Sequence, residues 1–70
     1  MKENTSLQLQ IESALLQDRL TEEADIEVLD NNGIITLRGA VPSREARDRA
    51  EAITRTVTGV TTVINELDVI

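Results

Sequence analysis

The dipeptide Asn32-Gly33 is the feature that most constrains how this chain folds, because it lies between two segments of alternating polarity. A two-residue type I′ turn needs positive φ at both positions, which Asn tolerates and Gly adopts freely. Before the turn, Ile26 and Val28 alternate with polar residues, and residues 34–41 alternate in the same way after it. Together these features predict a β-hairpin.

The turn also determines which residues of the two strands lie opposite each other. It pairs Val28 with Leu37 on one face of the hairpin and Glu27 with Arg38 on the other. The first pair is apolar and suits a core, whereas the second is oppositely charged and suits solvent. The pattern therefore predicts a strand pair with one buried face.

A segment with helical periodicity precedes the hairpin. Thr5 followed three residues later by Gln8 is typical of a capping box, in which each side chain accepts from a free backbone N–H of the first turn. The apolar positions then follow the helical period: Leu7, Ile11, Ala14 and Leu15. We expect a helix from this cap to about Arg19.

A second helix is predicted after Pro42, which ends the hairpin, with Ser43 as its N-cap and Gly59 closing it. Its apolar stripe consists of Ala46, Ala50, Ile53 and Val57. Two pairs of opposite charge, each four residues apart, are expected on its outer face: Glu45 with Arg49, and Glu51 with Arg55.

Residues 63–69 alternate again and predict a third strand. A right-handed crossover through the second helix makes this strand parallel to the second one. We therefore expect an α+β fold of order α-β-β-α-β, with a three-stranded mixed sheet in the order 1-2-3 and both helices packed on one face. At 70 residues the chain suits one domain, 1–70, with an ordered core of about residues 5–70.

The composition excludes several kinds of site. The chain has no histidine, cysteine or aromatic residue, so it lacks imidazole and thiolate ligands and platforms for stacking nucleic-acid bases. The serines considered as nucleophiles have no imidazole to activate them: Ser6, Ser13 and Ser43. We expect no enzymatic activity, no cofactor and no metal. A net charge of -6 also argues against a nucleic-acid partner.

The first 20 residues show no signal peptide, because polar and charged residues interrupt every apolar run. No stretch approaches the roughly 20 apolar residues of a membrane span. The expectation is a cytoplasmic protein if the chain is full length, and a periplasmic or envelope module if it belongs to an exported parent.

Several short segments carry a resemblance to a known family. They are Asp25-Ile26-Glu27-Val28, the ten residues 32–41, Thr58-Gly59-Val60 and residues 63–67. In this arrangement the chain resembles a BON domain, the module of bacterial osmotic-shock and nodulation proteins. The resemblance implies a non-catalytic module of the bacterial envelope, and the family is proposed to bind phospholipid membranes.

The second predicted helix carries most of the basic residues of this acidic chain. Residues 31–60 hold five arginines against three acidic residues, whereas the rest of the chain is strongly acidic. Four arginines are candidates for contact with anionic phospholipid: Arg44, Arg47, Arg49 and Arg55. The alternative is a solvated ladder of opposite charges, because Asp48 and Glu51 lie among them.

Two apolar groups have no place in the predicted core and define an alternative function, a protein–protein or self-association module. One group lies on the open sheet face: Leu29, Ile34, Thr36 and Ile64. The other lies on the far side of the first helix: Leu9, Leu16 and Leu20. A weak homodimer through the sheet face is one form that this alternative takes.

The three glycines are expected to be structural rather than parts of a phosphate-binding loop, because their spacing does not match one. Gly33 belongs to the hairpin turn and Gly59 ends the second helix. Gly39 is expected to allow a helix to pass close to the central strand.

Overall fold

The hairpin forms around the two predicted turn residues. In the structure, a computed structural model that describes residues 6–70, β1 (Asp25–Asn31) pairs antiparallel with β2 (Ile34–Val41). Asn32 and Gly33 form the turn, with φ of 54° and 91°. The Asp30 carboxylate accepts from the Gly33 N–H at 3.0 Å and closes the turn. The predicted pairings, Val28 with Leu37 and Glu27 with Arg38, are confirmed.

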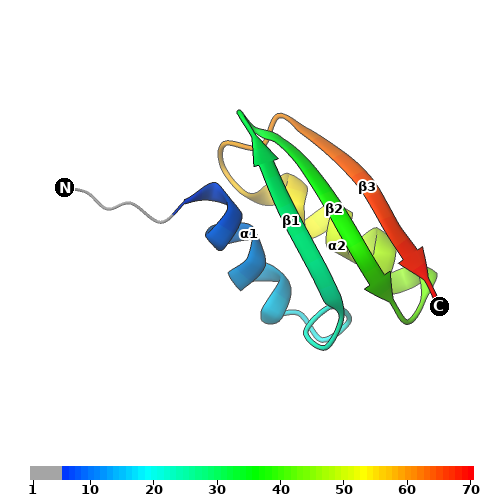
Figure 1. Cartoon of the computed structure of the whole chain (residues 1–70). Helices are drawn as coiled ribbons and strands as arrows, with labels where there is room; N and C mark the ends of the chain where they lie inside the picture. Colours follow the sequence, from blue (N-terminus) through cyan, green and yellow to red (C-terminus); the bar gives the residue numbers. More distant parts are fainter. Residues whose placement is uncertain (1–5) are drawn as a thin grey trace.

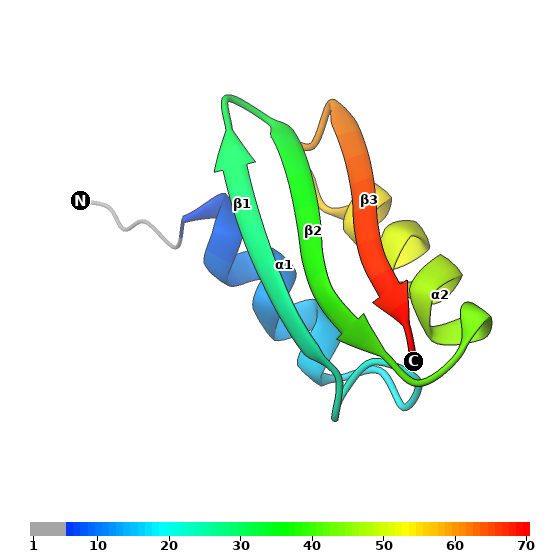
Figure 2. The ribbon, with the colours of Figure 1, turned by 45° about the vertical axis from the view of Figure 1, so that its right-hand side comes forward.

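The remaining elements complete an α-β-β-α-β chain. They are α1 (Leu7–Leu16), α2 (Arg44–Thr56) and β3 (Thr62–Val69). β3 runs parallel to β2, so the sheet order is β1-β2-β3, as predicted. Both helices lie on one face of the sheet, and the other face carries no helix (Figure 1 and Figure 2). The α+β architecture expected from the sequence is confirmed.

An aliphatic core fills the space between helices and sheet. It consists of Ile11, Leu15, Val28, Ile35, Leu37, Val41, Ala46, Ala50 and Leu67, each at most 5% exposed. The strand members alternate in sequence because only one face of each strand is covered. Ala46 and Ala50 lie one turn apart on α2, and their small side chains let this helix approach the sheet closely.

The first helix begins and ends differently from the prediction. Its N-cap is Ser6, whose hydroxyl accepts from the Leu9 N–H at 3.2 Å, whereas the predicted cap Thr5 lies outside the described residues. The helix ends at Leu16, three residues before Arg19.

Local hydrogen bonds stop this helix early. The Asp18 carboxylate accepts from the Leu20 N–H at 2.9 Å, and the buried Thr21 hydroxyl donates to the Leu15 carbonyl. A short polar side chain that bonds nearby backbone offers the chain an alternative to further helical turns. Leu20 therefore lies in the turn after α1 and not on the helix, contrary to the prediction.

Gly39 is required for a different reason from the predicted one. It pairs with Ile26 on the core side, as expected, but its φ is 128°, where an L side chain is strained. A Cβ built there would overlap the backbone carbonyl of Asp25 on β1. The close neighbour is thus the adjacent strand and not a passing helix.

Candidate interaction surfaces

The four arginines of α2 are all exposed, but two of them are engaged in ion pairs. The Arg49 guanidinium lies 3.2 Å from the Asp18 carboxylate, so this pair joins α2 to the turn after α1. Arg55 lies 2.6 Å from Glu51, as predicted. The predicted pair of Arg49 with Glu45 is not among the ion pairs of residues 6–70, because the long-range partner takes its place.

Arg44 and Arg47 form no ion pair with any described residue. They are three residues apart at the start of α2, so their side chains leave the same side of the helix. The free backbone N–H groups of a helix N-terminus add positive potential there. The geometry therefore divides the predicted arginine set into two residues held in ion pairs, Arg49 and Arg55, and two exposed residues without one, of which Arg47 acts on Glu51 only through its longer-range charge.

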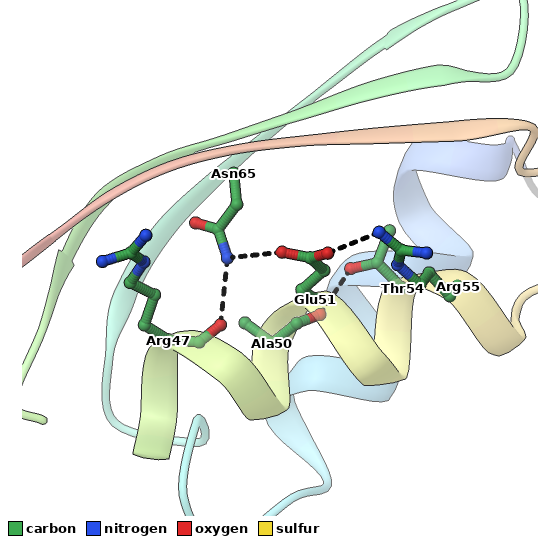
Figure 3. A network of polar contacts seen from close by, with 6 residues as sticks. All are labelled: Arg47, Ala50, Glu51, Thr54, Arg55 and Asn65. Atoms are coloured by element: carbon green, nitrogen blue, oxygen red, sulfur yellow. Dashed lines mark hydrogen bonds and ion pairs between the residues drawn. The ribbon is translucent and has the colours of Figure 1, made fainter. Parts of the chain in front are cut away.

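A hydrogen-bonded network explains why Arg55 is engaged (Figure 3). The Asn65 side-chain amide on β3 donates to the Glu51 carboxylate at 3.3 Å and to the Arg47 carbonyl at 3.1 Å. The hydrogen bond from Arg55 lowers the pKa of Glu51, and the one from Asn65 lowers it further. Partial burial opposes both, whereas the positive charges of Arg55 and Arg47 add to the lowering. Asn65 is not among the site residues predicted from the sequence, although a polar residue at an inward position of a strand is a visible signal.

The apolar residues predicted on the open sheet face do lie together. Pairing across the sheet aligns Leu29, Thr36 and Ile64 in one row, and Ile34 lies in the next row toward the hairpin turn. Leu29, Ile34 and Ile64 are 39%, 40% and 42% exposed. We call these four residues the apolar end of the open face.

Charged residues occupy the other end of the open face. The row next to Thr36 is Glu27–Arg38–Glu66, and the following row is Asp25–Ala40–Asp68. Arg38 lies 3.6 Å from Glu66, and both side chains are more than half exposed. These two rows, which we call the acidic end of the open face, present four carboxylates and one guanidinium. The small side chain of Ala40 lies between the two outermost acids.

The predicted leucine stripe of the first helix does not form as one surface. Leu9 and Leu16 are on α1 and are 55% and 63% exposed. Leu20 lies beyond the helix and lines a hollow with Arg49 and Ala52 of α2. The early end of α1 therefore sets Leu20 apart, whereas Leu9 and Leu16, seven residues apart, share one side of the helix, so the three leucines do not make a single stripe.

Among the described residues, no group of three or more acidic, cysteine or histidine side chains is placed to hold a metal ion. No helix in residues 6–70 is both long and apolar enough to cross a membrane. What the described part of the chain offers is therefore two surfaces, the solvent-facing arginines of α2 and the open sheet face.

Comparison with known proteins places this α-β-β-α-β module in a family. Residues 3–70 match the sequence pattern of the BON domain, and the chain belongs to the BON domain family. Over 64 residues it is 34% identical to osmotically-inducible protein Y of Escherichia coli, covering 91% of this chain and 32% of that protein.

A second relative is the outer membrane lipoprotein DolP of Haemophilus influenzae. It is 32% identical over 68 residues, which cover 96% of this chain and 35% of that protein. The chain therefore spans about a third of the length of each of these relatives.

Proposed function

We propose that this BON domain is a non-catalytic module of the bacterial envelope that contacts anionic phospholipid peripherally through Arg44 and Arg47. The observation that carries the proposal is their exposure without an ion-pair partner in residues 6–70, on one side of the first turns of α2. Arg49 and Arg55 already have carboxylate partners, so lipid phosphate would have to compete with these.

The similarity to an outer membrane lipoprotein supports a place at the envelope. Because the match covers only about a third of that protein, the location and the lipid contact are both parts of the proposal. The absence of aromatic residues argues for surface contact rather than deep insertion, since such rings commonly anchor proteins at the membrane interface.

The charge balance sets the expected strength. Each arginine near an anionic surface contributes about 1 kcal/mol, and a net charge of -6 on the whole chain opposes it. Binding is therefore weak. It is lost at moderate salt, because screening weakens the attraction between the arginines and the anionic surface.

Co-sedimentation with vesicles tests the proposal. The domain should pellet with phosphatidylglycerol vesicles at low salt and not with phosphatidylcholine vesicles. Arg44→Gln with Arg47→Gln should abolish this pelleting, whereas the matched double variant Arg49→Gln with Arg55→Gln, which has the same net charge, should retain most of it. Equal pelleting with both lipids, or equal loss in both variants, would contradict the assignment.

The open sheet face favours a second candidate function, a protein interaction module. Leu29 and Ile64 flank Thr36 in one row, Ile34 lies in the next row, and each of the three aliphatic side chains is about two-fifths exposed, so apolar surface gathers at this end of the face. This candidate needs no lipid and is independent of Arg44 and Arg47.

A further inference from the structure

We infer that the open sheet face binds a basic amphipathic helix of a protein partner, with the partner's apolar side chains on the apolar end and its Lys or Arg side chains on the acidic end. This inference rests on the second candidate function and specifies the chemistry of the partner. It is carried by the order of the rows across the sheet, apolar at one end and acidic at the other.

The acidic end identifies the charge of the occupant. Asp25 and Asp68 are each paired in register with Ala40, so a cationic side chain lying over that alanine meets a carboxylate on either side. The neighbouring row adds Glu27 on the strand edge, while Arg38 lies 3.6 Å from Glu66 and offsets that acid. A neutral or acidic partner would leave this end uncompensated.

A second copy of this chain is a poor occupant of the face. In a two-fold pairing about an axis along β2, Glu27 of one copy lies over Glu66 of the other, and the two Arg38 side chains meet. A two-fold axis across the strands keeps acids apart, but it either places the charged rows over the apolar rows or overlaps only the apolar end, where three aliphatic side chains are each about two-fifths exposed. That contact is far smaller than the roughly 800 Å² per partner of a typical specific interface.

The geometry of β2 sets the spacing within the partner. Thr36, in the middle of the apolar row, and Ala40, in the middle of the acidic row, are four residues apart on one face. At about 3.3 Å per strand residue they are about 13 Å apart. A helix rises about 1.5 Å per residue, so this span corresponds to about nine residues. The nearest position on the same stripe is about eight residues along, and the length of a Lys or Arg side chain covers the difference.

A helix suits the face because the sheet already packs helices on its other side, and α/β layers commonly have helices on both faces. Strand addition at the sheet edges is less suited. At the β1 edge, Val28 in the middle of the strand is fully buried, so an added strand could not reach it. At the β3 edge, the Leu67 N–H already donates to the Asn65 side chain at 3.1 Å and is not available to an added strand.

Titration with designed helical peptides tests the inference. The probe is an alanine-based peptide of about 18 residues with two leucines on one turn and two arginines eight residues further along the same stripe. A composition-matched peptide places the arginines on the opposite side of the helix, and a third replaces them with glutamate. We expect chemical-shift changes of ¹⁵N-labelled domain at the open face, with the probe binding about tenfold more tightly than either control peptide.

Variants of the domain locate the contact. Asp25→Asn with Asp68→Asn should lower the affinity for the probe peptide about fivefold, in line with the loss of two exposed charge contacts. Glu45→Gln with Asp48→Asn, which makes the same change of net charge on α2 at the other face of the sheet, should leave the affinity unchanged within about twofold. Ile34→Ser should lower the affinity for the probe and for both control peptides, because all three place leucines on the apolar end.

The outcomes distinguish failure of the basic-helix partner from failure of the second candidate function. If all three peptides bind the open face equally, the interaction module stands and the basic helix is wrong. If none of them shifts the open face, both the partner chemistry and the second candidate function are wrong, whereas vesicle binding through Arg44 and Arg47 is unaffected. If the domain alone dimerises through this face in analytical ultracentrifugation, a second copy is the occupant and the inference is overturned.

Discussion

The side-chain amide of Asn65 on β3 donates to the backbone carbonyl of Arg47 on α2 at 3.1 Å. Its amide oxygen also accepts from the Leu67 N–H at 3.1 Å, and the same amide nitrogen donates to Glu51 at 3.3 Å. One polar side chain therefore joins the edge strand to the helix that carries the arginines proposed to contact lipid, and it accepts a hydrogen bond from a backbone N–H of that strand.

Replacing Asn65 should destabilise the fold. Asn65→Ala leaves the Leu67 N–H without its acceptor, and we expect a loss of about 1–2 kcal/mol in the free energy of unfolding. Urea denaturation measures it. Asn31→Ala, on the exposed face of β1, is the control and should change stability by less than about 0.5 kcal/mol. An Asn65 variant as stable as the control would show that the network contributes nothing.

Gly39 and Gly59 provide a matched pair for backbone strain. Both have positive φ, 128° and 106°, but an added Cβ overlaps the Asp25 carbonyl only at Gly39. At Gly59 it would make an ordinary contact with the Leu7 side chain at 3.5 Å. Gly59→Ala should cost about 1 kcal/mol from strain alone, and Gly39→Ala at least about 2 kcal/mol. Equal urea midpoints for the two variants would contradict the steric account.

The Glu51 network predicts a pH dependence of stability. Because the Arg55 and Asn65 hydrogen bonds lower the pKa of Glu51 in the fold, its ionised carboxylate stabilises the folded state. This stabilisation is complete above the ordinary value of 4.5 and is lost as the pH falls through the lowered pKa. Glu51→Gln removes it at all pH values.

The measurement is urea unfolding of Glu51→Gln and the parent domain between about pH 3 and pH 7. The stability difference should be largest at pH 7 and shrink below the ordinary pKa of Glu51. Glu22→Gln corrects for the loss of one negative charge. A difference that stays constant, or grows, as the pH falls would contradict the network.

The sequence predicts those parts of the fold that depend on local patterns. Asn32-Gly33 determines the hairpin register, because the two positive φ values leave only one set of cross-strand partners. Ser43 and the alanine stripe likewise predict α2, where the Ser43 hydroxyl accepts from the Ala46 N–H at 3.1 Å. These features need no knowledge of tertiary contacts.

The errors arise where a distant partner decides the outcome. Arg49 pairs with Asp18 of the turn after α1 rather than with the residue one helical turn away, because the packing of the two helices brings them together. Gly39 is fixed by the Asp25 carbonyl of the neighbouring strand. Such contacts decide which arginines of α2 form ion pairs and which do not. The spacing of the arginines in the sequence therefore could not predict that Arg49 is paired while Arg44 is not.

The central claim is that lipid contact is made by Arg44 and Arg47 at the start of α2. Titration of the ¹⁵N-labelled domain with phosphatidylglycerol-containing bicelles, followed by chemical-shift mapping, tests it most directly. The account predicts changes centred on residues 43–48, reversed by moderate salt and absent from the Arg44→Gln with Arg47→Gln variant. Changes centred instead on Arg49 and Arg55, on α1 or on the open sheet face, or the same changes with phosphatidylcholine alone, would contradict it.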